Sequence, residues 1–272
     1  FPFKSTDAIF GFLPPFHSFG FTVTTMMPIL AGLKVAYYPN PNESRKIVSG
    51  IEAHGSTIVC GTPSFLSGIL KSSEPGQLAT LRILVAGAEK APAELFSRVA
   101  NLEGDAELIE GYGITECSPI LAMNRLGEES VGVGKPPPGV RLLVVDSDSF
   151  EPLPIGERGM VLAQGPNIFS GYLGDDAPNP FYEIKGESWY ITGDLGILND
   201  AGQLVLAGRL KRFVKIGGEM VSLPAMEDVL TQRWPMSEDG PVVAVEAFEI
   251  EGQRPVLCFF SSLDLTLSEA NE

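Results

Sequence analysis

Residues 111–116 read Gly-Tyr-Gly-Ile-Thr-Glu and place several chemically useful groups within six positions. The two glycines let a ligand approach the backbone closely, and Tyr112 can stack on a planar ring. The Thr115 hydroxyl can donate to a phosphate, and the Glu116 carboxylate can coordinate Mg2+. The segment therefore predicts a site for a phosphate and a metal, although an ordinary glycine-rich turn explains it about as well when it is taken alone.

Two further segments bring charged groups together. Residues 190–196 read Tyr-Ile-Thr-Gly-Asp-Leu-Gly, and Asp194 in this glycine-flanked loop has the geometry to bind both hydroxyls of a ribose. Taken alone, such a loop is more often a capped turn. Residues 208–219 carry Arg209, Lys211, Arg212 and Lys215 in an otherwise acidic chain. These cations predict either the solvated face of a hairpin or a hinge between domains that handles an anion.

Several common sites are missing from the sequence. It contains no G-x-x-x-x-G-K-[ST] motif, and residues 132–135 lack the remaining glycine of a dinucleotide fingerprint. Its two histidines, His17 and His54, and its three scattered cysteines form neither a tetrahedral metal site nor an obvious nucleophile–base pair. A bound metal would therefore have oxygen ligands. Unpaired cysteines fit reduced thiols in the cytosol.

Short β-rich runs alternate with amphipathic stretches as far as about residue 111, which predicts an α/β fold with a helix-covered, mostly parallel sheet. The predicted strands are 8–12, 34–38, 57–60, 82–86 and 107–111. The predicted helices are 44–54, 63–71 and 92–100, and the last two begin with proline. Residues 111–116 then follow the last strand, at the sheet edge where open α/β folds bind ligands.

Residues 8–33 carry no charged side chain, so hydropathy alone would suggest a membrane span. Pro14, Pro15 and Pro28 each interrupt a helix, and His17 and Ser18 would lie in hydrocarbon without partners. We expect a buried strand, a loop and a helix here, and no transmembrane span in this chain.

Between residues 131 and 206, short strands such as 141–145 and 160–163 alternate with glycine and proline clusters, which predicts a β-rich, distorted-barrel subdomain. Beyond Gly208, a strand at 213–216, a helix that begins at Pro224 with Met226, Val229 and Leu230 inward, and strands 242–248 and 256–261 predict the start of a small α+β domain. The expected division is a large domain, 1–207, made of subdomains 1–120 and 121–207, and a hinge with an incomplete small domain, 208–272.

Composition narrows the class of protein. The chain has 272 residues, of which 44% are hydrophobic, so it can bury a large core and is not disordered. It has 19 Lys and Arg against 34 Asp and Glu, a net charge of −15 that repels nucleic acid. We expect no nucleic-acid partner.

Taken together and in this order, the segments resemble the adenylate-forming superfamily of acyl-CoA synthetases, luciferases and peptide-synthetase adenylation domains. Residues 13–20, Leu-Pro-Pro-Phe-His-Ser-Phe-Gly, resemble its aromatic-histidine segment. Gly87, Ala88 and Glu89 resemble its adenine-side turn, and residues 156–172 its middle β-rich motif. Residues 16–20, 86–90 and 208–223 are most similar to the acyl-acyl-carrier-protein synthetase part of bacterial bifunctional enzymes that also reacylate 2-acylglycerophosphoethanolamine.

The resemblance implies roles for single residues. Tyr112, with Gly113 after it, would stack on the adenine of ATP or AMP beside the turn of residues 87–89. Thr115 would bond a phosphate, and Glu116 would coordinate Mg2+.

The resemblance also implies that Asp194 holds the ribose with Arg209 beside it. Lys211 would sit at the hinge about which the small domain rotates, and residues 217–218 would border the path of a thiol. His17 would lie between an acyl pocket and the phosphates.

The implied reaction is activation of a fatty acid with ATP. The carboxylate attacks the α-phosphorus, pyrophosphate leaves, and the acyl adenylate passes its acyl group to the phosphopantetheine thiol of acyl carrier protein, with coenzyme A as the other acceptor. The chargeless segment with Phe16, Phe19 and Phe21 suits an acyl chain. A cytoplasmic enzyme is implied, with the cytoplasmic face of the inner membrane as an open alternative for the parent protein.

Two parts of the superfamily's pattern are not found. The Ser/Thr/Gly-rich phosphate loop would precede residues 13–20, and a lysine that contacts the acyl phosphate would lie near the C-terminus. We therefore expect an incomplete chain that is inactive alone. A non-catalytic nucleotide or acyl-adenylate binding module stays open as an alternative, as does an amino-acid or aryl-acid adenylation domain, although residues 19–21 lack the carboxylate that would bind a substrate ammonium.

Overall fold

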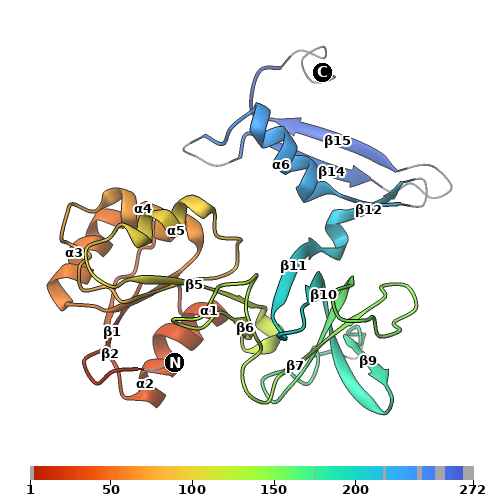
Figure 1. The fold of residues 1–272 in the computed structure, drawn as a ribbon, viewed down its shortest axis with the longest axis horizontal. Coiled ribbons are helices and arrows are strands. Elements are labelled where there is room, and N and C mark those ends of the chain that lie inside the picture. The colour runs from red at the N-terminus through yellow and green to blue at the C-terminus, as the bar shows by residue number, and fades with distance from the viewer. Residues whose placement is uncertain (1–2, 175, 217–218, 238–240, 249–254, 266–272) are drawn as a thin grey trace. The chain divides into compact units, whose positions relative to one another are not determined.

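The computed structural model describes residues 3–174, 176–216, 219–237, 241–248 and 255–265 (Figure 1). The chain divides into two compact units. The first contains Phe1–Thr192 and Ile197–Leu206, and the second contains Gly193–Gly196 and Ala207–Glu272. The sequence-based division at residues 207 and 208 stays a prediction about domains.

The first unit contains the predicted helix-covered, mostly parallel sheet. Its strands are β1 (Ala8–Gly11), β2 (Lys34–Tyr37), β3 (Ile58–Gly61), β4 (Ile83–Ala86), β5 (Glu107–Gly113) and β6 (Ile120–Met123). They lie in the order β2-β1-β3-β4-β5-β6. Neighbours from β2 to β5 pair in parallel, and β6 is an antiparallel edge strand. All residues of β1, β3 and β4 are buried, as expected for strands that are covered on both faces.

The strand order decides which face each helix covers. The chain moves from β1 to β2 in one direction and from β2 past β1 to β3, β4 and β5 in the other. Because such crossovers are right-handed, the reversal places the first helical segment on one face and the later helices on the other. Figure 1 shows this arrangement, with α3 (Ser44–His54), α4 (Pro63–Ser72) and α5 (Ala93–Ala100) together on one side of the sheet.

The expectation that Pro28 interrupts a helix is wrong. Residues 18–31 are continuously helical, through α1 (Ser18–Gly20), the π-helical η1 (Phe21–Met26) and α2 (Met27–Ala31). A proline cannot donate to the carbonyl four residues before it, which here belongs to Thr24. The Tyr37 hydroxyl of β2 donates to that carbonyl at 2.6 Å instead, so the proline leaves no buried acceptor unpaired.

Of the four predicted helix starts, those of α3 and α4 agree with the structure, whereas α6 (Leu223–Arg233) begins one residue before the predicted Pro224 and α5 one residue after Pro92. Helix α3 has the predicted bounds, and α4 begins at Pro63 because Thr62 accepts a hydrogen bond from the Phe65 N–H as its cap. Pro92, by contrast, is the cap of α5 rather than its first residue, since its ψ of 150° is extended. The helix therefore begins one residue later than predicted.

The β-rich part of the first unit confirms the predicted distorted-barrel subdomain. Its sheet has the order β11-β10-β8-β7, and β9 pairs with β10. The strands are β7 (Arg141–Val145), β8 (Arg158–Gln164), β9 (Phe181–Ile184), β10 (Glu187–Leu198) and β11 (Leu204–Arg209), of which residues 193–196 of β10 and 207–209 of β11 belong to the second unit. Tyr112, Cys117 and Leu121 belong to the hydrophobic core of this part, so the segment after β5 packs into it.

The second unit contains the predicted small α+β elements. They are η3 (Leu210–Arg212), β12 (Phe213–Ile216), β13 (Glu219–Ser222), α6 (Leu223–Arg233), β14 (Val243–Phe248) and β15 (Val256–Ser261). Strands β12 and β13 form one antiparallel pair, and β14 and β15 form another. Residues 217–218, which were predicted to border a thiol's path, lie outside the described residues.

The predicted inward face of α6 is partly wrong. Leu223, Met226 and Leu230 contact the small core, but Val229 is 64% exposed. At 3.6 residues per turn, Val229 lies about a quarter turn from the centre of the face formed by the other three. Hydrophobicity alone placed it inside, whereas helical phase places it outside.

None of the described helices is long and apolar enough to cross a membrane.

Candidate functional site

The sequence-predicted residues of the first unit lie in loops that follow parallel strands. His17 follows β1, Gly87 to Glu89 follow β4, and Thr115 and Glu116 follow β5. Parallel strands end at the same edge of a sheet, so the structure brings these loops together at the carboxyl edge. In this strand order the direction of winding reverses between β1 and β3, and open α/β sheets bind ligands at such a point.

Contacts between the loops confirm that they meet. The Ser18 and Thr115 hydroxyl oxygens lie 3.2 Å apart although 97 residues separate them. The Phe19 ring packs against Gly87, where an added Cβ would lie 3.3 Å from it. Residues of the aromatic-histidine segment thus touch both the turn after β4 and the segment after β5.

The segment after β5 depends on glycine. The register between β5 and β6 shifts between Tyr112 and Gly113, and a Cβ on Gly113 would lie 1.7 Å from the Pro119 carbonyl oxygen. No side chain fits there. Tyr112 is 7% exposed and packs in the core of the β-rich part, while Thr115 is exposed. The predicted stacking of Tyr112 on adenine stays a prediction.

Glu116 lies on the short 3-10 helix η2 (Thr115–Cys117) and is half-buried. The Tyr172 hydroxyl donates to its Oε1 at 2.8 Å. This hydrogen bond is the main cause that raises the pKa of Tyr172, so the hydroxyl stays protonated and the carboxylate remains the acceptor. Among the described residues, Oε2 of Glu116 has no hydrogen-bond partner.

This carboxylate fits a magnesium ion that shares its coordination with a nucleotide. Mg2+ prefers oxygen ligands and is held by one or two carboxylates together with phosphates. The described residues contain no group of three or more acidic, histidine or cysteine side chains that would hold a metal by themselves. Glu116 would hold the ion through Oε2, and phosphate and water would supply the other ligands.

The turn of residues 87–89 is held on both sides. Ala88 has φ of +71°, a left-handed conformation that costs a non-glycine residue about 1–3 kcal/mol. The Ser64 hydroxyl at the start of α4 donates to Glu89 at 2.8 Å. Just beyond the turn, the Ala91 N–H donates to the Glu110 carboxylate at 2.9 Å. Burial raises the pKa of Glu110, and the hydrogen bond from Ala91 opposes that rise.

His17 caps the helical segment that follows it. Its Nδ1 accepts a hydrogen bond from the Phe19 N–H at 3.2 Å, so the neutral imidazole carries its proton on Nε2. The side chain is exposed at the carboxyl edge and can therefore donate from Nε2. Phe16 and Phe21 are 91% and 48% exposed, and Phe19 packs on the main core. The predicted acyl pocket among these aromatic residues stays a prediction.

Asp194 lies within strand β10 rather than in the predicted loop, belongs to the second unit and is paired there with Arg209. The Arg209 Nε lies 2.9 Å from Asp194 Oδ1, and the two side chains are 60% and 6% exposed. The predicted neighbourhood of these two residues is confirmed. Their predicted contact with a ribose stays a prediction.

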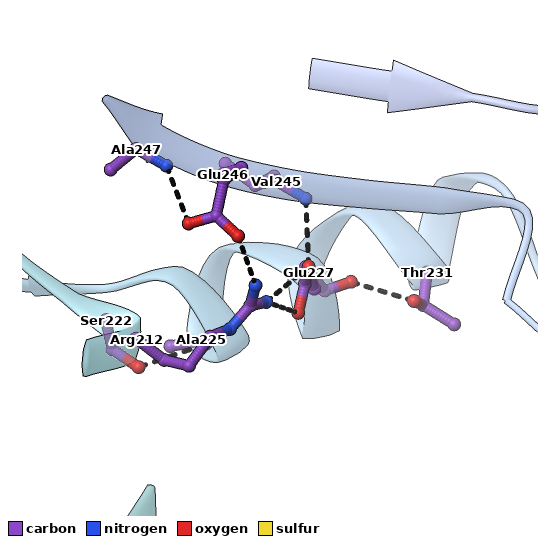
Figure 2. Close-up of polar contacts among 8 residues, drawn as sticks. All are labelled: Arg212, Ser222, Ala225, Glu227, Thr231, Val245, Glu246 and Ala247. Atoms are coloured by element: carbon purple, nitrogen blue, oxygen red, sulfur yellow. Dashed lines mark hydrogen bonds and ion pairs between the residues drawn. The ribbon is translucent and has the colours of Figure 1, made fainter. Parts of the chain in front are cut away.

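The two adjacent cations of η3 differ. Lys211 is exposed and makes no ion pair with the described residues, whereas Arg212 is held by two acids. Both Glu227 oxygens on α6 accept from Arg212 Nη2 at 2.7 Å, and Glu246 on β14 accepts from Nη1 at 3.3 Å (Figure 2). Glu227 also accepts from the Val245 N–H at 2.8 Å. Arg212 is thus part of the small unit's structure, and Lys211 is left available for an anion.

Sequence reasoning missed several residues that shape the site. Ser64, Glu110 and Asn167 were not singled out, and Ser18 and Tyr172 were given no role of their own within the motifs that contain them. Their partners are 19 to 97 residues away in the chain. No local pattern signals such a contact.

Comparison with known proteins shows what this chain is similar to. Residues 1–173 match the model of a family described as AMP-binding enzyme. 4-Coumarate–CoA ligase 1 of Arabidopsis thaliana is 30% identical over 281 residues, which cover 98% of this chain and 48% of that protein. A long-chain-fatty-acid–CoA ligase of Escherichia coli O6:H1 is 28% identical over 261 residues, which cover 94% of this chain and 45% of that protein. The chain spans about half the length of these relatives.

Solved structures share the fold. ATP-bound MatB from Rhodopseudomonas palustris superposes with a TM-score of 0.82 at 23% identity and covers 98% of this chain and 53% of its own. The O-succinylbenzoate coenzyme A synthetase MenE from Bacillus subtilis, in complex with ATP and magnesium ion, gives 0.79 at 21% identity over 99% and 55%. At these identities the likeness establishes the arrangement of the elements.

Proposed function

This chain belongs to the AMP-binding enzyme family, and from that membership we propose that it takes part in ATP-dependent activation of a fatty acid and its transfer to a phosphopantetheine thiol. The observation that carries the proposal is the meeting of three loops at one sheet edge. They bring His17, the turn of residues 87–89, Thr115 and Glu116 to the point where open α/β sheets bind nucleotides.

In the proposed reaction, each of the predicted site residues has a role that its side chain can perform. Thr115 donates its exposed hydroxyl to a phosphate, and Tyr112 lines the adenine side of the site. His17 donates from Nε2 to an anionic oxygen. The Glu116 carboxylate would hold Mg2+, and the ion would supply positive charge beside the departing pyrophosphate. Asp194 accepts from the ribose hydroxyls, and Lys211 offers its free ammonium on η3.

The acyl acceptor and the acid are the finer parts of the proposal. We favour acyl carrier protein over coenzyme A, and a fatty acid over other acids. The reason is that the sequence of residues 16–20 and 208–223 is most similar to that of acyl-carrier-protein synthetases. The E. coli relative supports a fatty acid, and its name specifies coenzyme A as the acceptor. The Arabidopsis relative supports an aromatic acid as a second candidate substrate.

Pyrophosphate exchange into ATP tests the proposal. The complete gene product that contains this chain is given radiolabelled pyrophosphate, ATP and a panel of fatty acids of graded length beside 4-coumarate. We expect exchange that depends on a fatty acid and on Mg2+. Exchange that occurs with 4-coumarate but with no fatty acid would show that the substrate is an aromatic acid. Nucleotide binding without exchange for any acid would favour a non-catalytic binding module.

Two further arms sharpen the result. Acyl carrier protein and coenzyme A are offered separately after adenylation, and the thioester formed is measured by mass spectrometry. The 272-residue chain is assayed beside the complete gene product, because we propose that these residues alone bind AMP weakly and give no exchange. Exchange by the short chain at the rate of the complete product would overturn that part.

A further inference from the structure

The segment that follows β8 runs beside η2 and holds its backbone. The Phe169 N–H donates to the Glu116 carbonyl at 2.8 Å. The Asn167 side-chain amide donates to the Cys117 and Ile120 carbonyls at 2.8 and 2.9 Å. Three hydrogen bonds from residues 167–169 therefore fix the backbone on which Glu116 stands.

Asn167 makes these bonds at a cost. Its Oδ1 is buried and has no hydrogen-bond partner within the described part of the chain, and it lies so close to Gly165 that a Cβ there would be 2.7 Å away. A buried acceptor that is left unpaired costs about 1–3 kcal/mol. This unpaired oxygen accompanies the two hydrogen bonds by which the same amide holds the loop around Glu116.

The same segment also holds the side chain of Glu116. Tyr172 donates its hydroxyl to Oε1, and its ring meets the Phe169 ring edge-on at 4.8 Å and 74°. Phe169 in turn packs edge-on against Tyr190 at 5.6 Å. The hydroxyl is thus aimed by an aromatic cluster, although Tyr172 itself is 45% exposed and contributes less to the core than a buried aromatic residue.

We propose that Tyr172 is a positioning residue that fixes the Glu116 carboxylate in the orientation in which Oε2 receives a divalent cation together with a nucleotide. This inference rests on the proposed function. A free glutamate side chain loses rotamer freedom when it is ordered. Tyr172 orders the Glu116 side chain before a cation binds, so cation binding does not include the loss of that rotamer freedom. Partners that orient a metal ligand typically raise metal affinity about 10- to 100-fold.

The test compares Tyr172→Phe with wild type in the complete gene product. Mn2+ is the probe, and its free concentration is followed by electron paramagnetic resonance with ATP present and no fatty acid, so that no turnover is involved. We expect Tyr172→Phe to bind Mn2+ about 10-fold more weakly or worse. Affinity for AMP without metal should stay at the wild-type value, because the ring and its contact with Phe169 remain.

Two controls isolate the hydroxyl of Tyr172. Tyr182→Phe removes the hydroxyl of a tyrosine that stacks on Phe150 at 4.1 Å in the same β-rich part, and it should bind Mn2+ as wild type does. In a Glu116→Gln background, Tyr172→Phe should cause no further loss, because the oriented charge is already gone.

The outcomes separate this inference from the proposed function. Wild-type affinity for Mn2+ and ATP in Tyr172→Phe would overturn the inference and leave the proposed function standing. A parallel loss of metal-free AMP binding would show a merely structural role and also overturn it. If the wild-type protein takes up no Mn2+ with ATP, the metal role of Glu116 is wrong and the inference falls with it.

Discussion

The two edges of the parallel sheet differ in their polar side chains, which are bonded to one another at the amino edge and exposed at the carboxyl edge. At the amino edge, Asp7, Thr57 and Arg82 stand just before β1, β3 and β4 and bind one another. Arg82 lies 2.5 Å from Asp7, Thr57 donates to Asp7 at 2.9 Å, and the Asp7 side chain is 1% exposed. At the carboxyl edge, His17, Glu89 and Thr115 are exposed, and their contacts join loops rather than strand starts.

The difference separates stability from function within one sheet. Burial by itself would raise the pKa of the Asp7 carboxyl, but hydrogen bonds from Arg82, from the Lys4 N–H and from Thr57 outweigh it and lower the pKa. The donors and acceptors of this network bond to one another, so the network is not arranged to bind a ligand. The carboxyl edge keeps donors and acceptors that a ligand can use, which is how sites on open α/β sheets are built.

Asp7→Ala should have the largest effect on stability. It leaves Arg82 without its buried partner, and breaking one side of a buried pair costs about 3–5 kcal/mol of unfolding free energy. Urea unfolding measures the loss, with Glu94→Ala as the control, because the pair of Glu94 and Arg98 is exposed and screened by solvent. A loss below about 1 kcal/mol for Asp7→Ala would contradict a structural role for the amino edge.

The same carboxyl gives a pH prediction. Its folded pKa is below its unfolded value of 3.8, so the stability that it contributes is present above about pH 3.8 and is lost as the pH falls through the lowered pKa. Asp7→Asn should unfold with a weaker dependence on pH in that acidic range than wild type, as measured by circular dichroism.

Glu116→Gln, in contrast to Asp7→Ala, should lower activity and leave stability unchanged. Pyrophosphate exchange by the complete gene product should fall about 100-fold or more, because the charge that binds the metal is lost. Stability should be unchanged, because the amide oxygen still accepts from Tyr172. Glu94→Gln on the exposed face of α5 serves as the matched control. If Glu116→Gln unfolds the protein instead, the two edges do not differ as described.

Asp194 makes the comparison sharper, because it is buried and ion-paired like Asp7 yet is predicted to act on a ligand. Asp194→Ala should weaken AMP binding about 10- to 100-fold, since charge-assisted hydrogen bonds are worth about 1.5–3 kcal/mol each. Isothermal titration measures this change. An unchanged AMP affinity with lowered stability would place Asp194 with Asp7 as a structural carboxylate.

Glu110→Gln should have the smallest effect. Burial raises the pKa of Glu110 above 4.5, so the wild type gains stability from this group at low pH and loses it as the pH rises through the raised pKa. The substituted amide would keep an acceptor for the Ala91 N–H and remove that dependence, with a change under about 1 kcal/mol at neutral pH. Thermal unfolding between about pH 4 and pH 8 measures it, and a wild-type pH profile in the variant would contradict the assignment.

The sequence by itself determined the order and type of the elements of the sheet. Runs such as Ile83–Ala86 are apolar throughout because both faces of the strand are covered, and Thr62 before Pro63 marks a helix start by local hydrogen bonding. The placement of residues 111–116 at a strand's carboxyl end follows from the same local signals. Local rules failed at Pro28, where the Tyr37 hydroxyl pairs the carbonyl that the proline leaves, and at Val229, which helical phase turns outward. They also failed at Pro92, whose extended backbone makes it the cap of α5.

Only the tertiary structure decided which side chains hold the candidate site. Ser18 reaches Thr115, Tyr172 reaches Glu116, and Arg212 reaches Glu227, and nothing in the residues adjacent to either partner predicts these meetings. The physical reason is that periodicity and capping depend on residues within about one helical turn, whereas a contact between loops depends on how whole strands and helices pack. The sequence therefore determined what chemistry each residue could perform, and the packing of the loops decided which residues perform it together.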